Sequence, residues 1–134
     1  MKEAFASTKV PENIQVKLAI DEIPINVDSG MMRRVFVNII TNAIDAMPNG
    51  GELTVECHES SGNLELSFTD TGTGFTDQAM TKLWKPLNTT KAQGSGLGLA
   101  ICRKIVEAHA GAISVKTALG KGATVAIIIP IKQL

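Results

Sequence analysis

The sequence predicts an α/β protein built as a two-layer α/β sandwich, in which a mixed, mostly antiparallel sheet is packed on one side by helices. Two observations predict this class. Several short segments alternate apolar and polar residues, which is typical of half-buried strands. Two longer segments, 30–47 and 97–109, place apolar residues at helical spacing. The order along the chain is strand, helix, two strands, loop, helix and two strands, which fits one sheet covered by two helices.

Several of the predicted strands show a period-two alternation of apolar and polar residues, most clearly 14–20 and 52–57. The predicted strands span 14–20, 52–57, 64–68, 112–117 and 122–130. A polar turn at 59–63 joins the second and third strands into a hairpin that ends at Asp70. The last strand is apolar on both faces, which indicates an interior position in the sheet.

The two long helices have recognisable ends. Asp28 is the expected N-cap of the helix over 30–47, and the Pro-Asn-Gly-Gly segment 48–51 ends that helix. Gly111 is the expected C-terminal stop of the helix over 97–109.

The segment between the hairpin and the second long helix has a different character. Residues 76–83 predict one short helix capped by Thr76. Residues 84–96 contain Pro, Asn, Thr, Lys, Gln and Gly without hydrophobic periodicity, which predicts a mobile loop.

Length and composition limit the classes of protein to which the chain can belong. The 134 residues indicate one domain over 12–134, preceded by the tail of a linker or helix over 1–11. Basic and acidic residues balance at 13 each, which argues against nucleic-acid binding. No stretch reaches the ~18 apolar residues of a membrane span, so we expect a cytoplasmic domain without membrane contact. Cys57 and Cys102 are isolated and stand at apolar positions, which predicts buried free thiols.

A polar stripe interrupts the first long helix. Asn38, Asn42 and Asp45 share one helix face, and apolar side chains surround them. A helix this apolar is expected to be buried, where amides are costly unless a partner satisfies them. That partner is a bound metal, water or phosphate on a functional interpretation, or a loop of the same core on a structural one.

Two glycine-rich segments follow the stripe. The segment 94–98, Gly-Ser-Gly-Leu-Gly, precedes the second long helix, where free backbone N–H groups and the helix dipole attract anions. The segment 70–74, Asp-Thr-Gly-Thr-Gly, follows a strand, so its Asp70 can accept a hydrogen bond from an exocyclic amine while glycines let a planar base approach. Each segment taken alone is equally compatible with an ordinary turn.

The combination of these motifs is more specific than its parts. In order, the chain carries Asn-Ile-Ile-Thr-Asn-Ala at 38–43, Asp-x-Gly-x-Gly at 70–74, a Pro- and Thr-containing segment at 83–91 and Gly-Ser-Gly-Leu-Gly-Leu at 94–99. This order resembles the ATP-binding catalytic domain of sensor histidine kinases, within the superfamily that includes DNA gyrase and MutL. The resemblance covers about residues 12–130 and implies a Bergerat-type ATP-binding fold.

The resemblance also implies site residues. Asn42 would coordinate a Mg²⁺ ion that bridges the phosphates of ATP, and Asn38 would contact phosphate or a magnesium-bound water. Asp70 would recognise the adenine amino group, and Thr124 would help to hold Asp70 or a water. Lys91 would be the lid cation nearest the γ-phosphate, so Asn38 and Lys91 are the expected catalytic residues. The full set of expected nucleotide contacts is Asn42, Asp45, Asp70, Gly72, Gly74, Phe75, Thr89, Thr90, Lys91, Gly94, Ser95, Gly96, Leu97, Gly98, Leu99 and Thr124.

Three features of the chain depart from the pattern, at four positions. Asp45 stands where many of these kinases have Lys, which removes one cation from the site. Trp84 and Leu87 replace phenylalanines of the lid motif, an apolar-for-apolar change. Gln93 replaces a further glycine, which predicts a slightly stiffer lid.

The residue type at position 38 distinguishes between the functional hypotheses. The leading one is a catalytic domain that binds Mg-ATP and donates the γ-phosphate to a histidine. Gyrase- and MutL-like ATPases, and anti-sigma-type serine kinases, resemble this chain but carry Glu at this position, and an amide cannot take a proton from the attacking group. A non-catalytic nucleotide-sensing module is the fourth hypothesis, because binding and transfer residues largely coincide.

The phosphoacceptor is expected outside this chain. His58 lies at a strand end and His109 at a helix end, which is typical of surface or capping residues. In the resembling family the acceptor lies in a helical hairpin that precedes this domain. The implied partners are therefore ATP, a histidine-containing dimerisation domain, supplied in the same polypeptide or in trans, and a downstream response regulator.

Overall fold

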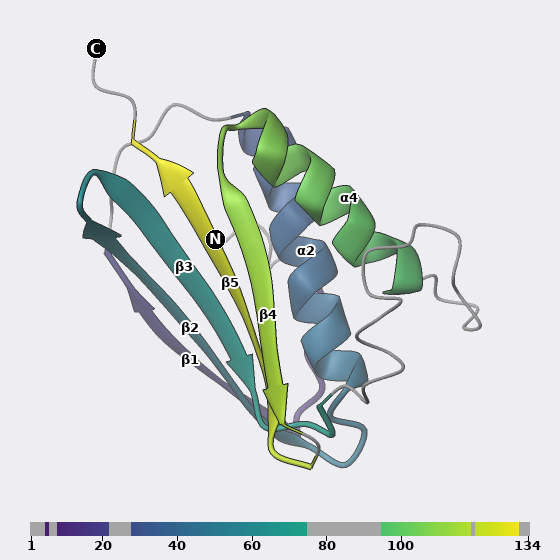
Figure 1. Ribbon diagram of the computed structural model, residues 1–134. Helices are drawn as coiled ribbons and strands as arrows, with labels where there is room; N and C mark the ends of the chain where they lie inside the picture. The colour runs from purple at the N-terminus through teal and green to yellow at the C-terminus, as the bar shows by residue number, and fades with distance from the viewer. Residues whose placement is uncertain (1–4, 6–7, 22–27, 75–94, 119, 132–134) are drawn as a thin grey trace.

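The fold is one sheet covered on one face by two helices, as predicted. The structure, a computed structural model, describes residues 5, 8–21, 28–74, 95–118 and 120–131. In Figure 1 the long helices α2 (Ser29–Asp45) and α4 (Ser95–Ala108) lie side by side against the same face of the sheet. The predicted short helix at 76–83 and most of the predicted loop at 84–96 lie outside the described residues.

The sheet has five strands in the order β1-β2-β3-β5-β4. They are β1 (Ile14–Ile20), β2 (Gly51–Ser60), β3 (Asn63–Asp70), β4 (Ala112–Ala118) and β5 (Gly122–Pro130). The β1–β2 pair is parallel and the other three pairs are antiparallel, so the sheet is mixed and mostly antiparallel. Strand β5 lies between β3 and β4, as predicted, but helices cover only one of its faces, and Ile128 on the other face is 42% exposed.

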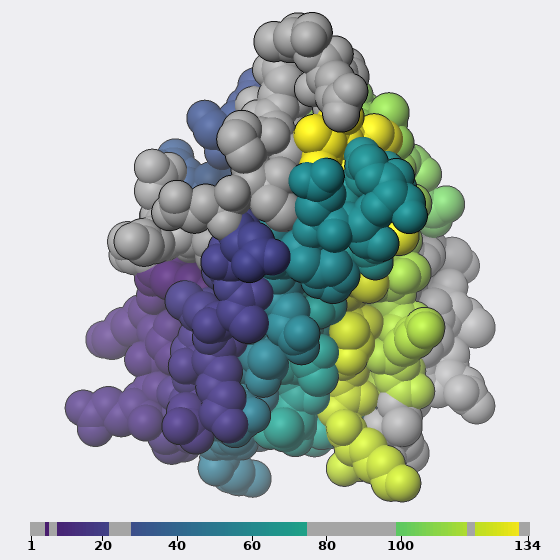
Figure 2. Space-filling view, turned by 90° about the vertical axis from the view of Figure 1, so that its left-hand side faces the viewer, coloured from purple at the N-terminus to yellow at the C-terminus, as the bar shows by residue number. Residues whose placement is uncertain are grey.

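The core lies between the sheet and the two helices. Every second residue of the central strands points toward the helices and is buried, including Leu53, Phe68 and Ile127. Helix α2 packs Val35 and Ile39 onto this layer, and Phe36 tilts against Phe68 with ring centroids 5.9 Å apart. Figure 2 shows the opposite face of the sheet, with the five strands side by side.

Helix α2 begins as the sequence predicts and ends slightly earlier. The Asp28 side chain accepts a hydrogen bond from the backbone N–H of Met31 at 2.9 Å, so Asp28 is the N-cap. The last helical residue is Asp45, and Ala46 is the C-cap. Gly50 and Gly51 follow with positive φ angles of 93° and 154°, which turn the chain directly into β2.

The end of helix α4 corrects the prediction that Gly111 is its stop signal. The helix closes with a Schellman motif, in which Gly111 N donates to Val106 O at 2.9 Å and Ala110 N donates to Glu107 O at 3.0 Å. The left-handed residue of this motif is Ala110, with φ of 62°. Gly111 is required for a different reason: a Cβ there would overlap Ile128 O of the neighbouring strand.

These two positions allow a paired test. Ala110→Gly removes a Cβ from a left-handed residue and is expected to stabilise the fold by about 0.5–1 kcal/mol. Gly111→Ala forces a Cβ against β5 and is expected to destabilise by about 1–3 kcal/mol. Urea unfolding of both variants measures the two signs, and Gly30→Ala, whose Cβ would meet nothing nearer than 3.5 Å, is the control that measures the ordinary gain of about 0.5–1 kcal/mol for Gly→Ala in a helix. A loss of stability in Ala110→Gly would contradict the assignment.

Candidate nucleotide-binding site

The candidate site is centred on Asp70, the last residue of β3. Its side chain is 7% exposed, the only charged or polar one among the described residues that is buried to this extent. Asp70 Oδ1 accepts a hydrogen bond from Gly72 N at 2.9 Å. Burial raises the pKa of the carboxyl above its ordinary value, while hydrogen bonds from the amides of Gly72 and Ala123 partly offset this rise.

The loop after Asp70 lies tightly against the end of α2. Thr73 N donates to Ala46 O at 3.1 Å, and Gly120 N donates to Thr73 O at 2.8 Å. A Cβ at Gly72 would overlap Ala46 O, so Gly72 is needed for this approach. Gly74 has a positive φ of 72° and is the last described residue of the loop. Gly72 therefore has a packing role in the structure, whereas Gly74 provides a left-handed backbone conformation.

The asparagine stripe is only partly buried. Asn38 and Asn42 are half-buried and Asp45 is exposed. The expectation that the amides are enclosed in the core is therefore met only in part, since Asn38 contacts Cys102 of α4 while Asp45 faces solvent. No described side chain with buried polar atoms lacks a hydrogen-bond partner.

Helix α4 runs antiparallel to α2 and places its N-terminus near the stripe. The backbone N–H of Asp28, at the start of α2, donates to Nε2 of His109, beyond the end of α4, at 3.1 Å. Further along α2, Cys102 Sγ donates to Val35 O at 3.6 Å and contacts the Asn38 side chain. The N-terminal end of α4 is therefore directed toward the Asn42 end of α2, as Figure 1 also shows.

The glycine-rich segment differs in detail from the prediction. Helix α4 begins at Ser95, not at 97, so Gly96, Leu97 and Gly98 belong to its first turns. The free N–H groups expected of a helix N-terminus are thus those of the first turn from Ser95. Leu99 is 4% exposed and packs in the core, so its side chain is not available to a nucleotide.

Thr124 is not brought together with Asp70. Its hydroxyl lies 3.1 Å from that of Thr69, and both residues alternate with buried neighbours, so they face the outer side of the sheet. The residue beside Asp70 in the register is Ala123, whose side chain is on the helix-facing side. Residue 123, not residue 124, is on the same face of the sheet as Asp70. Because residue 123 is an alanine, this position offers no hydroxyl to hold Asp70 or a water.

Several expected site residues lie outside the described part of the chain. They are Phe75, Thr89, Thr90, Lys91 and Gly94, together with the variant lid positions Trp84, Leu87 and Gln93.

The two histidines have the ordinary roles expected of them. His109 donates from Nδ1 to Ile105 O at 2.8 Å and accepts at Nε2 from Asp28 N, so both ring nitrogens are engaged. It joins the end of α4 to the start of α2. His58 is exposed in β2 on the outer side of the sheet.

Both cysteines are free and buried, as predicted. Burial raises the pKa of Cys102 to about 11, and the contacts with the Asn38 side chain and the Arg34 charge only partly offset this. Burial likewise raises the pKa of Cys57. Cys102 is therefore a protonated thiol at neutral pH, and it supports Asn38 from the α4 side.

Comparison with known proteins identifies the family. Residues 27–133 match the family described as histidine kinase-, DNA gyrase B-, and HSP90-like ATPases. The chain belongs to this family. It is 36% identical over 113 residues to sporulation kinase C of Bacillus subtilis, with 84% of this chain and 26% of that protein covered. The curated kinases it matches are several times longer, and the chain spans about a quarter of their length or less.

Solved structures agree with this assignment. The nucleotide-free catalytic domain of the histidine kinase ThkA superposes with a TM-score of 0.78 at 30% identity, covering 89% of this chain and 80% of that one. Full-length ShkA in complex with AMPPNP gives a TM-score of 0.75 at 26% identity, covering 90% of this chain and 26% of that one. The predicted kinase-like fold is confirmed. No helix in the described parts of this family member is long and apolar enough to cross a membrane.

Sequence reasoning did not single out Thr71 or Ala123, and it predicted Cys102 only as a buried thiol, not as a neighbour of Asn38. In the sequence Thr71 is only a spacer between Asp70 and Gly72, although a β-branched hydroxyl directly after a strand often bonds to backbone. Ala123 and the contact of Cys102 with Asn38 give no sequence signal, because they depend on which residues the fold places side by side.

The buried charge of Asp70 predicts a stability that depends on pH. Its pKa is raised in the folded state, so between 3.8 and that raised value the folded protein binds more protons than the unfolded one. Stability contributed by this group therefore falls as pH rises through that window. Asp70→Asn removes the buried charge and keeps the acceptor for Gly72 N, so it is expected to raise Tm by about 2–5 °C at pH 8.

The gain in Asp70→Asn should shrink as the pH falls from 8 through the raised pKa of Asp70, because the carboxyl then becomes protonated as well. Thermal melts of both proteins across this pH range measure the effect. Glu56→Asn, on the exposed face of β2, is the control and should show no such trend. A constant difference at all pH values would contradict a role for ionisation.

Proposed function

We propose that this chain binds Mg-ATP and is the catalytic domain that transfers the γ-phosphate to a histidine on a separate dimerisation domain, with a response regulator as the next acceptor. The domain would comprise residues 12–134, and residues 1–11 would belong to a preceding linker. The observation that carries the proposal is the buried carboxylate of Asp70, held by backbone amides at the same end of the fold as the asparagine stripe. The AMPPNP complex of the similar kinase ShkA supports a nucleotide ligand.

Adenine recognition is assigned to Asp70. Gly72 N engages Oδ1, which leaves acceptor capacity on the carboxylate for the exocyclic amine of the base. The surrounding residues exclude most solvent from this carboxylate, so an amine hydrogen bond to it would be strong and selective. A guanine base presents a carbonyl oxygen where adenine presents its amine, and would face the carboxylate with an acceptor.

The phosphates are assigned to the region between the stripe and the start of α4. Backbone N–H groups of the first α4 turn, from Ser95, would donate to phosphate oxygens, and Gly96 and Gly98 would allow close approach. Asp45 would be repelled by the polyphosphate, so Lys91 would supply the compensating charge.

The donor set on α2 fits a nucleotide-delivered Mg²⁺ ion. Asn42 offers one amide oxygen on a half-buried side chain, a suitable hard ligand for this ion. The described residues contain no cluster of three His, Cys, Asp or Glu side chains that could hold a metal. When bound, the ion would neutralise charge on the phosphates, and Asn42 would orient it.

Transfer to an external acceptor is favoured over hydrolysis by the groups around position 38. Asn38 cannot accept a proton, and the thiol that it contacts is already protonated, with the pKa of Cys102 raised to about 11. Neither group can activate a water molecule. Asn38 is therefore assigned to contact phosphate or a magnesium-bound water.

The proposal is tested by nucleotide binding and phosphotransfer. We expect the purified chain to bind Mg-ATP with micromolar to millimolar affinity, to release phosphate negligibly, and to label a supplied histidine-containing dimerisation domain from radioactive ATP. Steady phosphate release at several turnovers per minute would indicate an ATPase instead. Binding without transfer to any histidine domain would favour a nucleotide-sensing module.

Asn42→Ala separates the metal role from a structural one. The variant is expected to lose phosphotransfer at least 100-fold, while ADP still binds through Asp70. Its Tm should change little, because the Asn42 side chain is half-buried and Ala is the better helix former. Transfer assays and thermal melts provide the measurements, with Asn49→Ala, in the exposed turn after α2, as the control. A collapsed Tm would instead indicate that Asn42 is a structural residue.

A further inference from the structure

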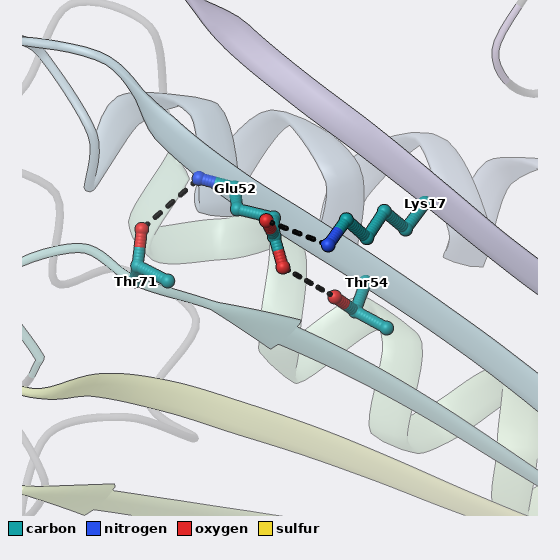
Figure 3. Close-up of polar contacts among 4 residues, drawn as sticks. All are labelled: Lys17, Glu52, Thr54 and Thr71. Atoms are coloured by element: carbon teal, nitrogen blue, oxygen red, sulfur yellow. Dashed lines mark hydrogen bonds and ion pairs between the residues drawn. The ribbon is translucent and has the colours of Figure 1, made fainter.

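Thr71 makes a two-way connection between the Asp70 loop and the start of β2. Its hydroxyl oxygen accepts from the backbone N–H of Glu52 at 3.0 Å (Figure 3). The backbone N–H of Thr71 donates to Glu52 O at 3.2 Å. The β2–β3 register places Leu53 opposite Asp70 as its last pair on this side. The Thr71–Glu52 connection therefore extends the β2–β3 pairing by one residue pair. One of its two hydrogen bonds is made by backbone groups alone, and the other is made by the Thr71 side chain.

The same hydroxyl also contacts the segment that follows α2. As a donor it points to Sδ of Met47, 3.7 Å away, and Met47 is 2% exposed. Gly51 leaves room for this arrangement, since a Cβ there would lie 2.5 Å from Thr71 Oγ1 and 2.7 Å from Met47 Sδ. Although Thr71 is exposed, its hydroxyl is engaged by two neighbours, with Glu52 N using its acceptor capacity and Met47 Sδ its donor capacity.

These contacts lie on one side of the amide that orients Asp70. Gly72 N is the donor to Asp70 Oδ1, and Gly72 is held before it by Thr71 and after it by the bond from Thr73 N to Ala46 O. Loss of the Thr71 hydroxyl would leave Glu52 N without its acceptor and would release one of these two restraints.

We propose that the Thr71 hydroxyl is a positioning group for nucleotide recognition, which fixes the Gly72 amide and through it the direction in which the Asp70 carboxylate meets the base. This inference rests on the proposed function, in which Asp70 reads adenine. Thr71 acts through Asp70 and does not touch the nucleotide itself.

Four variants of the chain separate the hydroxyl from side-chain volume and from general stability. Thr71→Val keeps the shape and removes the hydroxyl, Thr71→Ala removes both, and Thr71→Ser restores the hydroxyl. Thr54→Val is the matched control, because the Thr54 hydroxyl also contacts Glu52, but through the Glu52 carboxylate at 3.4 Å, on the outer face with Lys17 (Figure 3).

The first measurement is Mg-ATP affinity by calorimetry or by displacement of a fluorescent analogue. Thr71→Val and Thr71→Ala are expected to weaken ATP about three- to tenfold, whereas Thr71→Ser and Thr54→Val should stay within about twofold of the wild type. In an Asp70→Ala background, which removes the side-chain acceptor for Gly72 N, Thr71→Val should weaken any remaining ATP binding by less than about twofold, because a positioning residue has no effect without the group that it positions. An equal loss in both backgrounds would overturn the proposal.

The second measurement needs no nucleotide. Hydrogen exchange of the Gly72 amide, normalised to that of Leu66 in the middle of β3, reports the bond to Asp70 directly. It should accelerate about three- to tenfold in Thr71→Val and Thr71→Ala but not in Thr71→Ser or Thr54→Val. Unchanged Gly72 exchange in both hydroxyl-free variants would also overturn the proposal.

The two measurements distinguish this inference from the proposed function. A wild-type chain that binds no ATP, yet shows the Gly72 exchange pattern, would refute the nucleotide function and keep the connection between Thr71 and Asp70. A wild-type chain that binds ATP, with affinity unchanged in both hydroxyl-free variants, would refute the positioning role alone.

Discussion

The close approach of the Asp70 loop to the end of α2 is the constraint on which the site depends. The contact is made by backbone: Thr73 N reaches Ala46 O, and Gly72 lies so near the same carbonyl that no side chain fits between them. Gly122 has the same property on the other side, where a Cβ would overlap Asp70 O. Sheet and helix are thereby joined at the one end of the fold where the buried carboxylate and the asparagine stripe both lie.

This constraint gives the buried charge of Asp70 a physical explanation. A carboxylate that is nearly enclosed by protein raises the free energy of the folded state, which is why its pKa is raised. Backbone amides of Gly72 and Ala123 recover part of this cost, and they can do so only because the loop is held in place. A purely structural residue at this position could be apolar, so the retention of a carboxylate favours a role in ligand recognition.

Much of the fold was predictable because its signals are local. The alternation in β2 and β3, the Asp28 cap and the apolar positions of α2 each follow from residues that are neighbours in sequence. The candidate site was predictable only as a set of motifs. Thr124 was assigned to the face of Asp70, but a shift of one residue in a strand reverses the face, and the register makes Ala123 the neighbour of Asp70.

The burial of the asparagine stripe could not be predicted from the sequence. Periodicity gave its face correctly but not its environment, because burial depends on how the second helix packs. Cys102 of α4 approaches α2 at Val35 and Asn38, and His109 fixes the far end of the helix pair at Asp28. Beyond these contacts Asn42 is half-buried and Asp45 is exposed.

At the end of α4 the left-handed residue and the glycine are two different, neighbouring residues. A glycine after a helix is normally explained by a left-handed backbone, yet here Ala110 has the left-handed φ and Gly111 does not. Gly111 is needed instead because a Cβ would overlap Ile128 O, where the chain turns from α4 into β4 directly beside β5. Ala110 therefore has a left-handed conformation that is unfavourable for alanine, next to a position where only glycine fits. The same turn places His109 beside Asp28 at the start of α2. The packing of β5 therefore determines the local conformation at the end of α4, and through His109 it contributes to holding the two helices that carry the site.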